Sequence, residues 1–297
     1  MEPSRDELTR LQDEVLRSIR AAVPSPEEHL AVAFSGGVDS TLLLALAVEA
    51  LGAERVLAVT AASESLPQSE LAGCQALTAY LGVEHRLLRT RELQRQGYRD
   101  NAGDRCYYCK SELFEALAEE LGGERGARVA AVAYGATLDD LGDHRPGLRA
   151  AAEHGALRPL ADAGLGKPEI RALARELGLP NWDKPAHPCL ASRVPYGQEV
   201  NAGKLGMIER AEALLRGLGL SDLRVRHHEQ SSPSGVKHLA RIEVPLAELS
   251  RLVAPGARDA VVSGLRAIGY AYVALDLEGF RSGRLNEVLP ASLPVIS

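Results

Sequence analysis

The residues with the clearest capacity for chemistry follow a short apolar run near the start of the chain. They are Ser35, Gly36, Gly37, Val38, Asp39 and Ser40. Glycine lets a backbone approach an anion without a Cβ atom in the way, and the amides at a helix N-terminus attract phosphate oxygens. The two serines add hydroxyl donors. The Asp39 carboxylate would repel a bare phosphate, so it is expected to bind a Mg2+ ion instead. This pattern predicts a nucleotide-phosphate loop, and its plainer interpretation is an ordinary glycine-rich turn between a strand and a helix.

Two cysteines, Cys106 and Cys109, lie three residues apart at the start of a segment with helical character. Residues at this spacing share one face of a helix, and a helix N-terminus favours the thiolate that binds metals or attacks an electrophile. The pair therefore predicts a metal-binding or reactive site. Two alternatives stay open: the two cysteines are buried together in the core by chance, or they form half of a zinc site. Cys74, inside an apolar helical segment, is expected to be a small buried residue.

Cys189 lies in a different setting, a loop that prolines on both sides hold extended. Arg193 follows it closely, and a neighbouring cation favours the thiolate form of a cysteine. The loop therefore predicts a reactive thiol, with a buried loop cysteine as the alternative.

Composition and charge narrow the class of protein. The chain has 297 residues, of which 45% are hydrophobic and 25% charged, and its net charge is −6. These values exclude a collagenous or wholly disordered chain, and the acidic balance argues against a broad nucleic-acid surface. The longest apolar run is far shorter than the ~20 residues of a membrane span, and the charged N-terminus is unlike a secretory signal. We expect a soluble, cytoplasmic protein that binds neither nucleic acid nor membrane, with too few cysteines for a disulfide framework.

Hydrophobic periodicity predicts alternating strands and helices over the first two thirds of the chain. Strands are expected at 31–34, 56–60, 85–88 and 129–134, and helices at 5–22, 41–51, 68–81, 106–121 and 169–177. Further on, helices are expected at 202–217, 246–253 and 257–268, and strands at 223–227, 238–244 and 270–277. Strands separated by helices predict a doubly wound α/β domain with a parallel sheet. We therefore predict an α/β domain over 1–197 and a smaller α+β domain over 198–297.

The phosphate loop resembles the PP-loop of ATP pyrophosphatases, and it lacks the Lys-Ser/Thr pair of a Walker A motif. Together with four further motifs, it resembles LarE, the ATP-dependent sulfurtransferase family of nickel-pincer nucleotide biosynthesis. These motifs are Arg145-Pro-Gly-Leu, Cys189-Leu-Ala-Ser-Arg-Val-Pro-Tyr-Gly, Arg224-Val-Arg226 and Asp276-Leu-Glu-Gly-Phe-Arg281-Ser-Gly-Arg284. The ordered set covers most of the chain and is far more specific than any single motif.

The resemblance implies an activity and its cofactors. ATP would adenylate the carboxylates of pyridinium-3,5-biscarboxylic acid mononucleotide, and sulfur would then displace AMP to give thiocarboxylates. ATP and Mg2+ are implied, with Asp39 as the Mg2+ ligand and Cys189 as the sulfur-handling residue. The family has two sulfur routes: sacrifice of the cysteine's own sulfur, and delivery from a [4Fe–4S] cluster on three cysteines. Because the chain carries the additional pair, the prediction favours a cluster on Cys106, Cys109 and Cys189.

The resemblance also implies a mononucleotide site. Its residues would be Ser192, Arg193, Arg224, Arg226, Glu243 and Arg281. Arg224 and Arg226 alternate along an expected strand and so project to one face, where the guanidinium fork suits phosphate. Solvated surface arginine is the plain alternative for each. Lys110 is a candidate cation for charge developing at the α-phosphate, or a solvated helix lysine. His227 and His228 receive no role, because histidine pairs on strands are more often structural or exposed.

Three other functions share parts of this pattern. A PP-loop tRNA thiolase uses the same chemistry on a nucleobase, and the acidic charge argues against it. An amide ligase of the NAD or GMP synthetase type shares the loop but does not need Cys189 or the cysteine pair. A non-enzymatic ATP-binding module leaves the arginine motifs unexplained. The resemblance further implies a homo-oligomer that works with other proteins of nickel-pincer biosynthesis.

Overall fold

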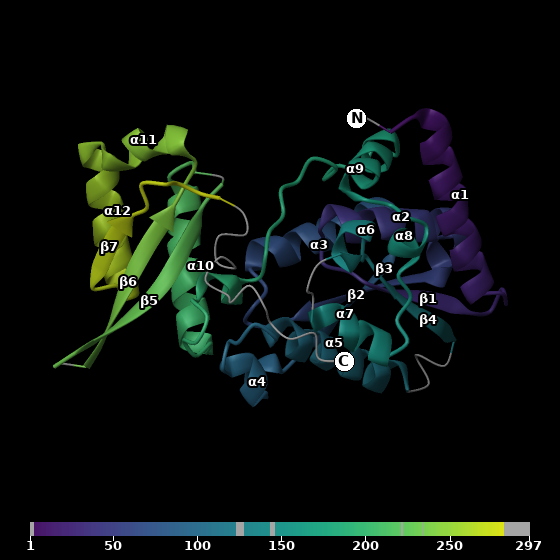
Figure 1. Cartoon of the computed structure of the whole chain (residues 1–297), viewed down its shortest axis with the longest axis horizontal. Helices are drawn as coiled ribbons and strands as arrows, with labels where there is room; N and C mark the ends of the chain where they lie inside the picture. The colour runs from purple at the N-terminus through teal and green to yellow at the C-terminus, as the bar shows by residue number, and fades with distance from the viewer. Residues whose placement is uncertain (1–2, 123–127, 143–145, 221, 234, 282–297) are drawn as a thin grey trace. The chain divides into compact units, whose positions relative to one another are not determined.

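The structure is a computed structural model that describes residues 3–122, 128–142, 146–220, 222–233 and 235–281. By their internal contacts the residues form two compact units (Figure 1). The first unit comprises Met1–Glu92 and Cys106–His187, and the second comprises Leu93–Arg105 and Pro188–Ser297. These contacts group residues 188–197 and 93–105 with the second unit, whereas the division into domains after residue 197 stays a prediction.

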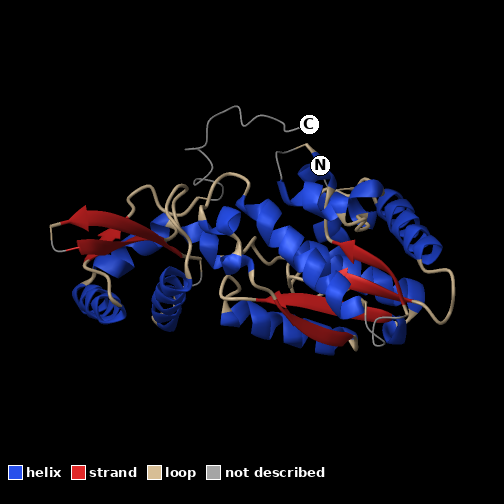
Figure 2. Ribbon diagram, turned by 90° about the horizontal axis from the view of Figure 1, so that it is seen from below, coloured by secondary structure: helices blue, strands red, loops and turns tan. Residues whose placement is uncertain are grey.

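A four-stranded parallel sheet forms the centre of the first unit. Its strands are β1 (His29–Ala33), β2 (Val56–Ala62), β3 (Glu84–Arg89) and β4 (Val129–Tyr134), in the order β3-β2-β1-β4. Each neighbouring pair is parallel. The longer helices of this part are α1 (Arg5–Ala22), α2 (Val38–Leu51), α3 (Gln68–Leu81), α5 (Arg105–Leu121) and α9 (Lys167–Glu176). The α/β parallel-sheet fold is thus confirmed, and Figure 2 shows the helices and strands of this layered arrangement.

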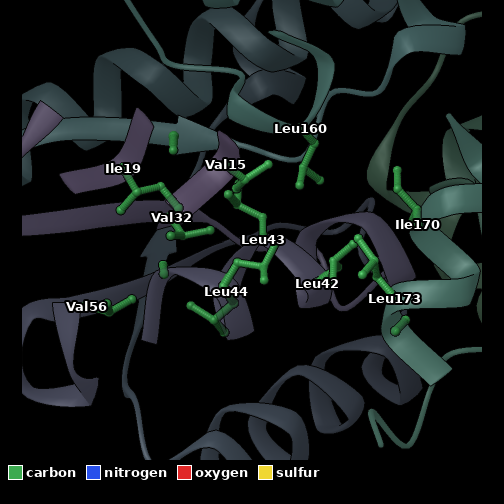
Figure 3. Packing of buried hydrophobic residues seen from close by; sticks show 14 of the residues in the cluster. Val15, Ile19, Val32, Leu42, Leu43, Leu44, Val56, Leu160, Ile170 and Leu173 are labelled. Carbon is green, nitrogen blue, oxygen red and sulfur yellow. The ribbon is translucent and has the colours of Figure 1, made fainter. Parts of the chain in front are cut away.

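Both faces of this sheet are buried, which explains why its central strands are almost continuously apolar. Along β1, Leu30 and Val32 join a core with α1, α2 and α9, whereas Ala31 and Ala33 join a second core with α5. The period-2 alternation of a strand sends successive side chains to opposite faces. Figure 3 shows the first core, in which Val32 lies among side chains of α1 and α2.

The second unit has a three-stranded sheet with helices packed on one face. Its strands are β5 (Arg224–Ser232), β6 (Gly235–Glu243) and β7 (Tyr272–Leu275), and its helices are α4 (Gln96–Arg99), α10 (Ala202–Gly217), α11 (Leu249–Val253) and α12 (Pro255–Ile268). β5 and β6 are antiparallel, and β6 and β7 are parallel. Val225 and Ile242 pack against the helices, so the alternating residues Arg224 and Arg226 lie on the other face.

The structure departs from the predicted elements in a few places. α2 begins at Val38 rather than at 41, which places Asp39 in the first turn of the helix. β5 and β6 extend beyond the strand ends predicted at 227 and 238, because antiparallel pairing continues to Ser232 and Gly235. The helix predicted at 246–253 is divided into η4 (Leu246–Glu248) and α11. Short helices that were not predicted are α4, α6 (Leu138–Leu141), α7 (Pro146–Glu153), α8 (Pro159–Asp162), η1 (Ala53–Arg55), η2 (Glu92–Gln94) and η3 (Leu190–Arg193). Within the described ranges, no helix has the length and apolar character needed to cross a membrane.

The turn from β1 into α2 packs directly on α3. Gly36 has φ +68°, and a Cβ atom at this position would lie 2.8 Å from the Sγ atom of the buried Cys74. A residue with a Cβ atom is therefore disfavoured at position 36 for two reasons: the backbone is left-handed, and the Cβ atom would clash with the Cys74 thiol.

We predict that Gly36→Ala destabilises the protein more than Gly82→Ala does. Gly82 has nearly the same φ, +67°, but open space around its Cβ position. The left-handed backbone costs a non-glycine residue about 1–2 kcal/mol, and overpacking adds roughly 1–3 kcal/mol for Gly36 alone. Urea unfolding of both variants measures the difference. In a Cys74→Ala background the two losses should become similar, and an equal loss in the wild-type background would contradict the steric role of Cys74.

Candidate functional site

The predicted phosphate loop, residues 35–40, lies between the end of β1 and the first turn of α2. The Ser35 amide donates to Ser40 Oγ at 3.3 Å, and that hydroxyl donates to the carbonyl oxygen of Gly37 at 3.1 Å. A Cβ atom on Gly135, which follows β4, would lie 2.8 Å from the Ser40 nitrogen. The loop is therefore closed on itself and packed against the neighbouring strand end. The first amides of α2, which a helix cannot satisfy internally, start at this loop.

Residues from a distant segment brace the loop, and sequence reasoning missed them. The Asn181 side chain donates to the Gly36 carbonyl at 3.2 Å and to Thr41 Oγ1 at 3.0 Å. Lys184 Nζ donates to the same carbonyl at 3.2 Å and forms an ion pair with Glu70 at 2.7 Å. These bonds fix the backbone of the turn, so that its amide groups keep their orientation.

Asp39 forms an ion pair that the sequence did not reveal. Lys167 Nζ lies 2.5 Å from Asp39 Oδ2, and both side chains are partly exposed. The Lys167 amide also donates to Asp139 Oδ2 at 2.7 Å, which fixes the start of α9. A usable signal existed, because a lysine in the first turn of a helix opposes the helix dipole and so indicates a specific anionic partner.

Cys106, Cys109 and Lys110 lie near the N-terminus of α5. Cys106 is exposed, and Cys109 is partly buried. Lys110 Nζ lies 5.9 Å from the centre of the Tyr134 ring, and Tyr134 pairs in register with Ala33 at the end of β1. Lys110 is thus placed at the same carboxyl edge of the sheet as the phosphate loop. Cys74, by contrast, is fully buried as expected, and burial raises the pKa of its thiol.

In the second unit, Cys189 caps the short helix η3, and a buried arginine holds its backbone. Arg193 donates from Nη1 to the carbonyl oxygens of Pro188 at 2.5 Å and Cys189 at 3.0 Å, and to Ser192 Oγ at 3.0 Å. Its side chain is only 1% exposed. The Arg193 guanidinium thus donates to the carbonyl oxygens of the cysteine loop.

Glu212 of α10 anchors this arginine. Its carboxylate accepts from Arg193 Nε at 2.8 Å, from Arg216 at 2.9 Å and from the Val225 amide of β5 at 3.2 Å. Burial opposes the charged form, but the two guanidinium groups and the amide outweigh it and hold the pKa of Glu212 below its ordinary value. One carboxylate thus joins the cysteine loop, α10 and β5.

The face of the sheet opposite the helices carries buried arginines. Arg226 donates from Nε to Glu243 at 3.0 Å and from Nη1 to the Ser192 carbonyl at 2.7 Å. Arg224 lies 4.9 Å from the centre of the Phe280 ring. Burial and the neighbouring guanidinium of Arg193 lower the pKa of Arg224 to about 10. Cations crowded together in a buried place are stabilised by an anion, and arginine suits the oxygens of a phosphate.

The predicted site residues thus fall into two groups. The phosphate loop, Lys110, Cys106 and Cys109 belong to the first unit. Cys189, Ser192, Arg193, Arg224, Arg226, Glu243 and Arg281 belong to the second. Arg281 is exposed and follows Phe280, whose amide donates to the Val244 carbonyl at 2.8 Å beside the end of β6. Arg145 and Arg284 lie outside the described residues.

The NAD synthase family profile matches residues 12–103. A protein of Synechocystis sp. described as uncharacterised is 43% identical over 87% of this chain and 92% of its own length. The pyridinium-3,5-bisthiocarboxylic acid mononucleotide synthase of Lactiplantibacillus plantarum is 38% identical over 88% of this chain and 90% of its own length. A Methanocaldococcus jannaschii protein, also described as uncharacterised, is 28% identical over 86% of this chain and 92% of its own length.

We predict that Glu212→Gln strongly destabilises the protein, by about 3–5 kcal/mol at neutral pH, because it leaves Arg193 buried without its counter-charge. Glu248→Gln serves as the control. Glu248 pairs with Arg251 on the surface of the same unit at 3.3 Å, and such pairs contribute at most about 1 kcal/mol. Denaturant unfolding measures both, and similar losses would contradict the anchoring role.

The same variant has a predicted pH signature. The pKa of the Glu212 carboxyl is lower in the folded protein than its ordinary value of 4.5, which we take for the unfolded chain. The charged carboxylate therefore stabilises the fold fully at pH values above 4.5, and this stabilisation is lost as the pH falls through the folded-state pKa. The wild type should therefore lose more stability than Glu212→Gln when the pH is lowered below about 4.5.

Proposed function

Because the chain belongs to the LarE family of sulfur-transferring synthases, we propose that it converts pyridinium-3,5-biscarboxylic acid mononucleotide into thiocarboxylates for the nickel-pincer nucleotide. The Lactiplantibacillus plantarum relative is a synthase of the corresponding bisthiocarboxylic acid mononucleotide. The observation that carries the proposal is the presence, in one chain, of a braced phosphate loop and a buried arginine face. The first suits ATP and the second suits a mononucleotide.

In the proposed reaction, ATP first activates a substrate carboxylate. A carboxylate oxygen attacks the α-phosphorus of ATP, the bond to the β-phosphate oxygen breaks, and pyrophosphate leaves. The product is an acyl-adenylate, whose AMP is a far better leaving group than oxide. A sulfur nucleophile then attacks the carbonyl carbon and expels AMP, which leaves a thiocarboxylate.

We assign the ATP site to the phosphate loop and its neighbours. The amides that start α2, with the Ser35 and Ser40 hydroxyls, would hold the outer phosphates. Asp39 offers a partly exposed carboxylate, which is the donor that Mg2+ prefers, so this residue fits the ion. Bound Mg2+ would offset the charge of the phosphates. Lys167 would then exchange its bond with Asp39 for a phosphate oxygen, and Lys110 would face the α-phosphate.

We assign the mononucleotide site to the second unit. Arg224, Arg226 and Arg281 would bind the phosphate of the substrate, with Ser192 as a hydroxyl donor. Arg193 and Glu243 would act as positioning residues, since Arg193 holds the Cys189 loop and Glu243 accepts from Arg226. A phosphate among these guanidinium groups would offset the mutual repulsion of buried cations.

For the sulfur step, we favour Cys106, Cys109 and Cys189 as ligands of a [4Fe–4S] cluster. The donor chemistry fits, because none of the three thiols is in a disulfide within the described residues and all three are partly accessible. Such a cluster, with one iron left open, would supply a sulfide to the activated carboxylate. The protein's own contribution is to present the thiolates, two from the first turns of α5 and one from the cap of η3.

The alternative sulfur route uses Cys189 alone. Its thiolate would attack the acyl-adenylate and expel AMP, giving a thioester. Removal of the Cys189 Cα proton would then break the S–Cβ bond, leaving a thiocarboxylate on the substrate and dehydroalanine in the chain. The two routes differ in what remains of Cys189 after turnover.

The adenylation step is tested by pyrophosphate exchange. We predict that labelled pyrophosphate enters ATP only when the biscarboxylated mononucleotide is present, and that tRNA does not replace it. Asp39→Ala should lower the exchange rate at least about 100-fold, because it removes the group that holds charge-neutralising Mg2+. Asp162→Asn, at an exposed ion pair with Arg158, should leave the rate unchanged. Exchange without the mononucleotide, or with tRNA, would refute the proposal.

The sulfur route is tested by anaerobic purification. We predict that the wild type contains iron and acid-labile sulfide, that Cys106→Ala loses both together with activity, and that Cys74→Ala retains the iron and sulfide, because Cys74 is buried elsewhere in the first unit. A colourless, iron-free Cys106→Ala protein with full activity would overturn the cluster route. Mass spectrometry would then show dehydroalanine at position 189 after a single turnover.

A further inference from the structure

Two adjacent histidines of β5 lie on opposite faces of the sheet. His228 faces the side of the buried arginines and accepts from Arg241 Nε at 3.2 Å. His227 lies on the helix-covered side and is completely buried. The expectation that neither histidine has a role treated them as a pair, whereas the alternation of the strand gives them different surroundings.

Three ligating groups meet on the helix-covered face of the hairpin. Glu229 follows His227 by two residues, and His238 of β6 pairs in register with Glu229. All three side chains therefore project from the same face. Their ligand atoms lie within 4.8 Å of one another. Such proximity across two strands is set by the register of β5 and β6.

The spacing of the two imidazoles suits a metal ion. His227 Nε2 lies 3.1 Å from His238 Nδ1. Two nitrogens bound to one tetrahedral zinc at its usual bond length are about 3.3 Å apart. Glu229 Oε1 lies 3.9 Å from His238 Nδ1, so a small movement of this partly exposed side chain completes three ligands.

Neighbouring groups orient two of the three ligands. The Tyr270 hydroxyl lies 3.2 Å from His227 Nδ1, and a hydrogen bond from this nitrogen leaves the lone pair of Nε2 directed at His238. Outer partners of this kind fix the tautomer of metal-binding histidines. Lys204 Nζ bonds Glu229 Oε2 at 2.8 Å, and Oε1 is the oxygen nearer His238. The Lys204 ammonium also weakens the attraction of the site for cations.

We propose that His227, Glu229 and His238 form a binding site for a divalent transition metal of the Zn2+ type, separate from the ATP and mononucleotide sites. Two imidazoles and one carboxylate are a donor set for zinc rather than for Mg2+ or Ca2+, which prefer oxygen ligands alone. Water takes the fourth position. His238 and Glu229 are both 29% exposed, which gives an ion access from solvent.

The metal clamps the β5–β6 hairpin. His227 directly follows Arg226, so an ion that joins His227 to His238 fixes the register of the strand that carries the arginine face. The proposal concerns the hairpin alone and holds whichever substrate the arginines bind.

The test measures zinc bound by the full-length protein in equilibrium dialysis, without ATP or substrate. Because cysteines also bind zinc, the readout is the difference between variants. His238→Ala should bind one equivalent less than the wild type, and His228→Ala, a change on the other face of the same strand, should bind as many as the wild type. Glu229→Gln should weaken the same equivalent at least tenfold while keeping the fold, since its side chain is partly exposed.

Crystals soaked in zinc chloride locate the ion. We expect an anomalous peak at the zinc edge between His227 Nε2 and His238 Nδ1. Equal zinc binding by the wild type and His238→Ala, or a crystal without a peak at this position, would overturn the proposal and leave the two imidazoles as a hydrogen-bonded pair.

Discussion

The turn from β1 into α2 is the constraint on which the first unit depends. The backbone must leave the sheet and start a helix with a left-handed residue at Gly36 and Cys74 directly behind it. A chain that meets this demand presents the first amides of α2 at the carboxyl edge of the sheet. Asn181 and Lys184 hold the same carbonyl group, so the turn is fixed by side chains from far along the sequence. The proposed phosphate binding is therefore a consequence of how the sheet and the helix are joined.

Buried charge organises the second unit in a comparable way. Arg193 and Glu212 are almost completely buried, and each would be costly to bury alone. Their bond ties the carbonyl groups of the Cys189 loop to α10, and the Val225 amide ties the same carboxylate to β5. The other face of β5 carries several guanidinium groups, and burial together with these neighbours lowers the pKa of Arg224. Guanidinium groups gathered on one face suit a phosphate, and this is the basis of the proposed mononucleotide site.

These two arrangements divide the chemical work. In the proposed reaction, the first unit would bind and split the nucleotide with amides, hydroxyls, Asp39 and cationic lysines. The second unit would recognise the substrate phosphate and present Cys189. The three thiols are divided between the units as well, with Cys106 and Cys109 on α5 and Cys189 at the N-cap of η3. The sheet of the second unit carries arginines on one face and the side chains of His227, Glu229 and His238 on the other.

Local structure and the chemical types of the site follow from short stretches of sequence. Apolar periodicity predicted the main strands and helices, and α3, β4 and α10 have the predicted bounds. The loop at residues 35–40 indicated phosphate binding because glycine and helix-start signals act over a few residues. Which side chains meet depends instead on how the folded chain packs. Asp39 and Lys167 are 128 residues apart, and the Asn181–Gly36 bond joins residues 145 apart. The contact of Arg193 with backbone carbonyls, and of His227 with His238, likewise depended on burial and strand register. Periodicity fixes which face of an element a residue occupies, but it contains no information on the partner that the folded chain brings to that face.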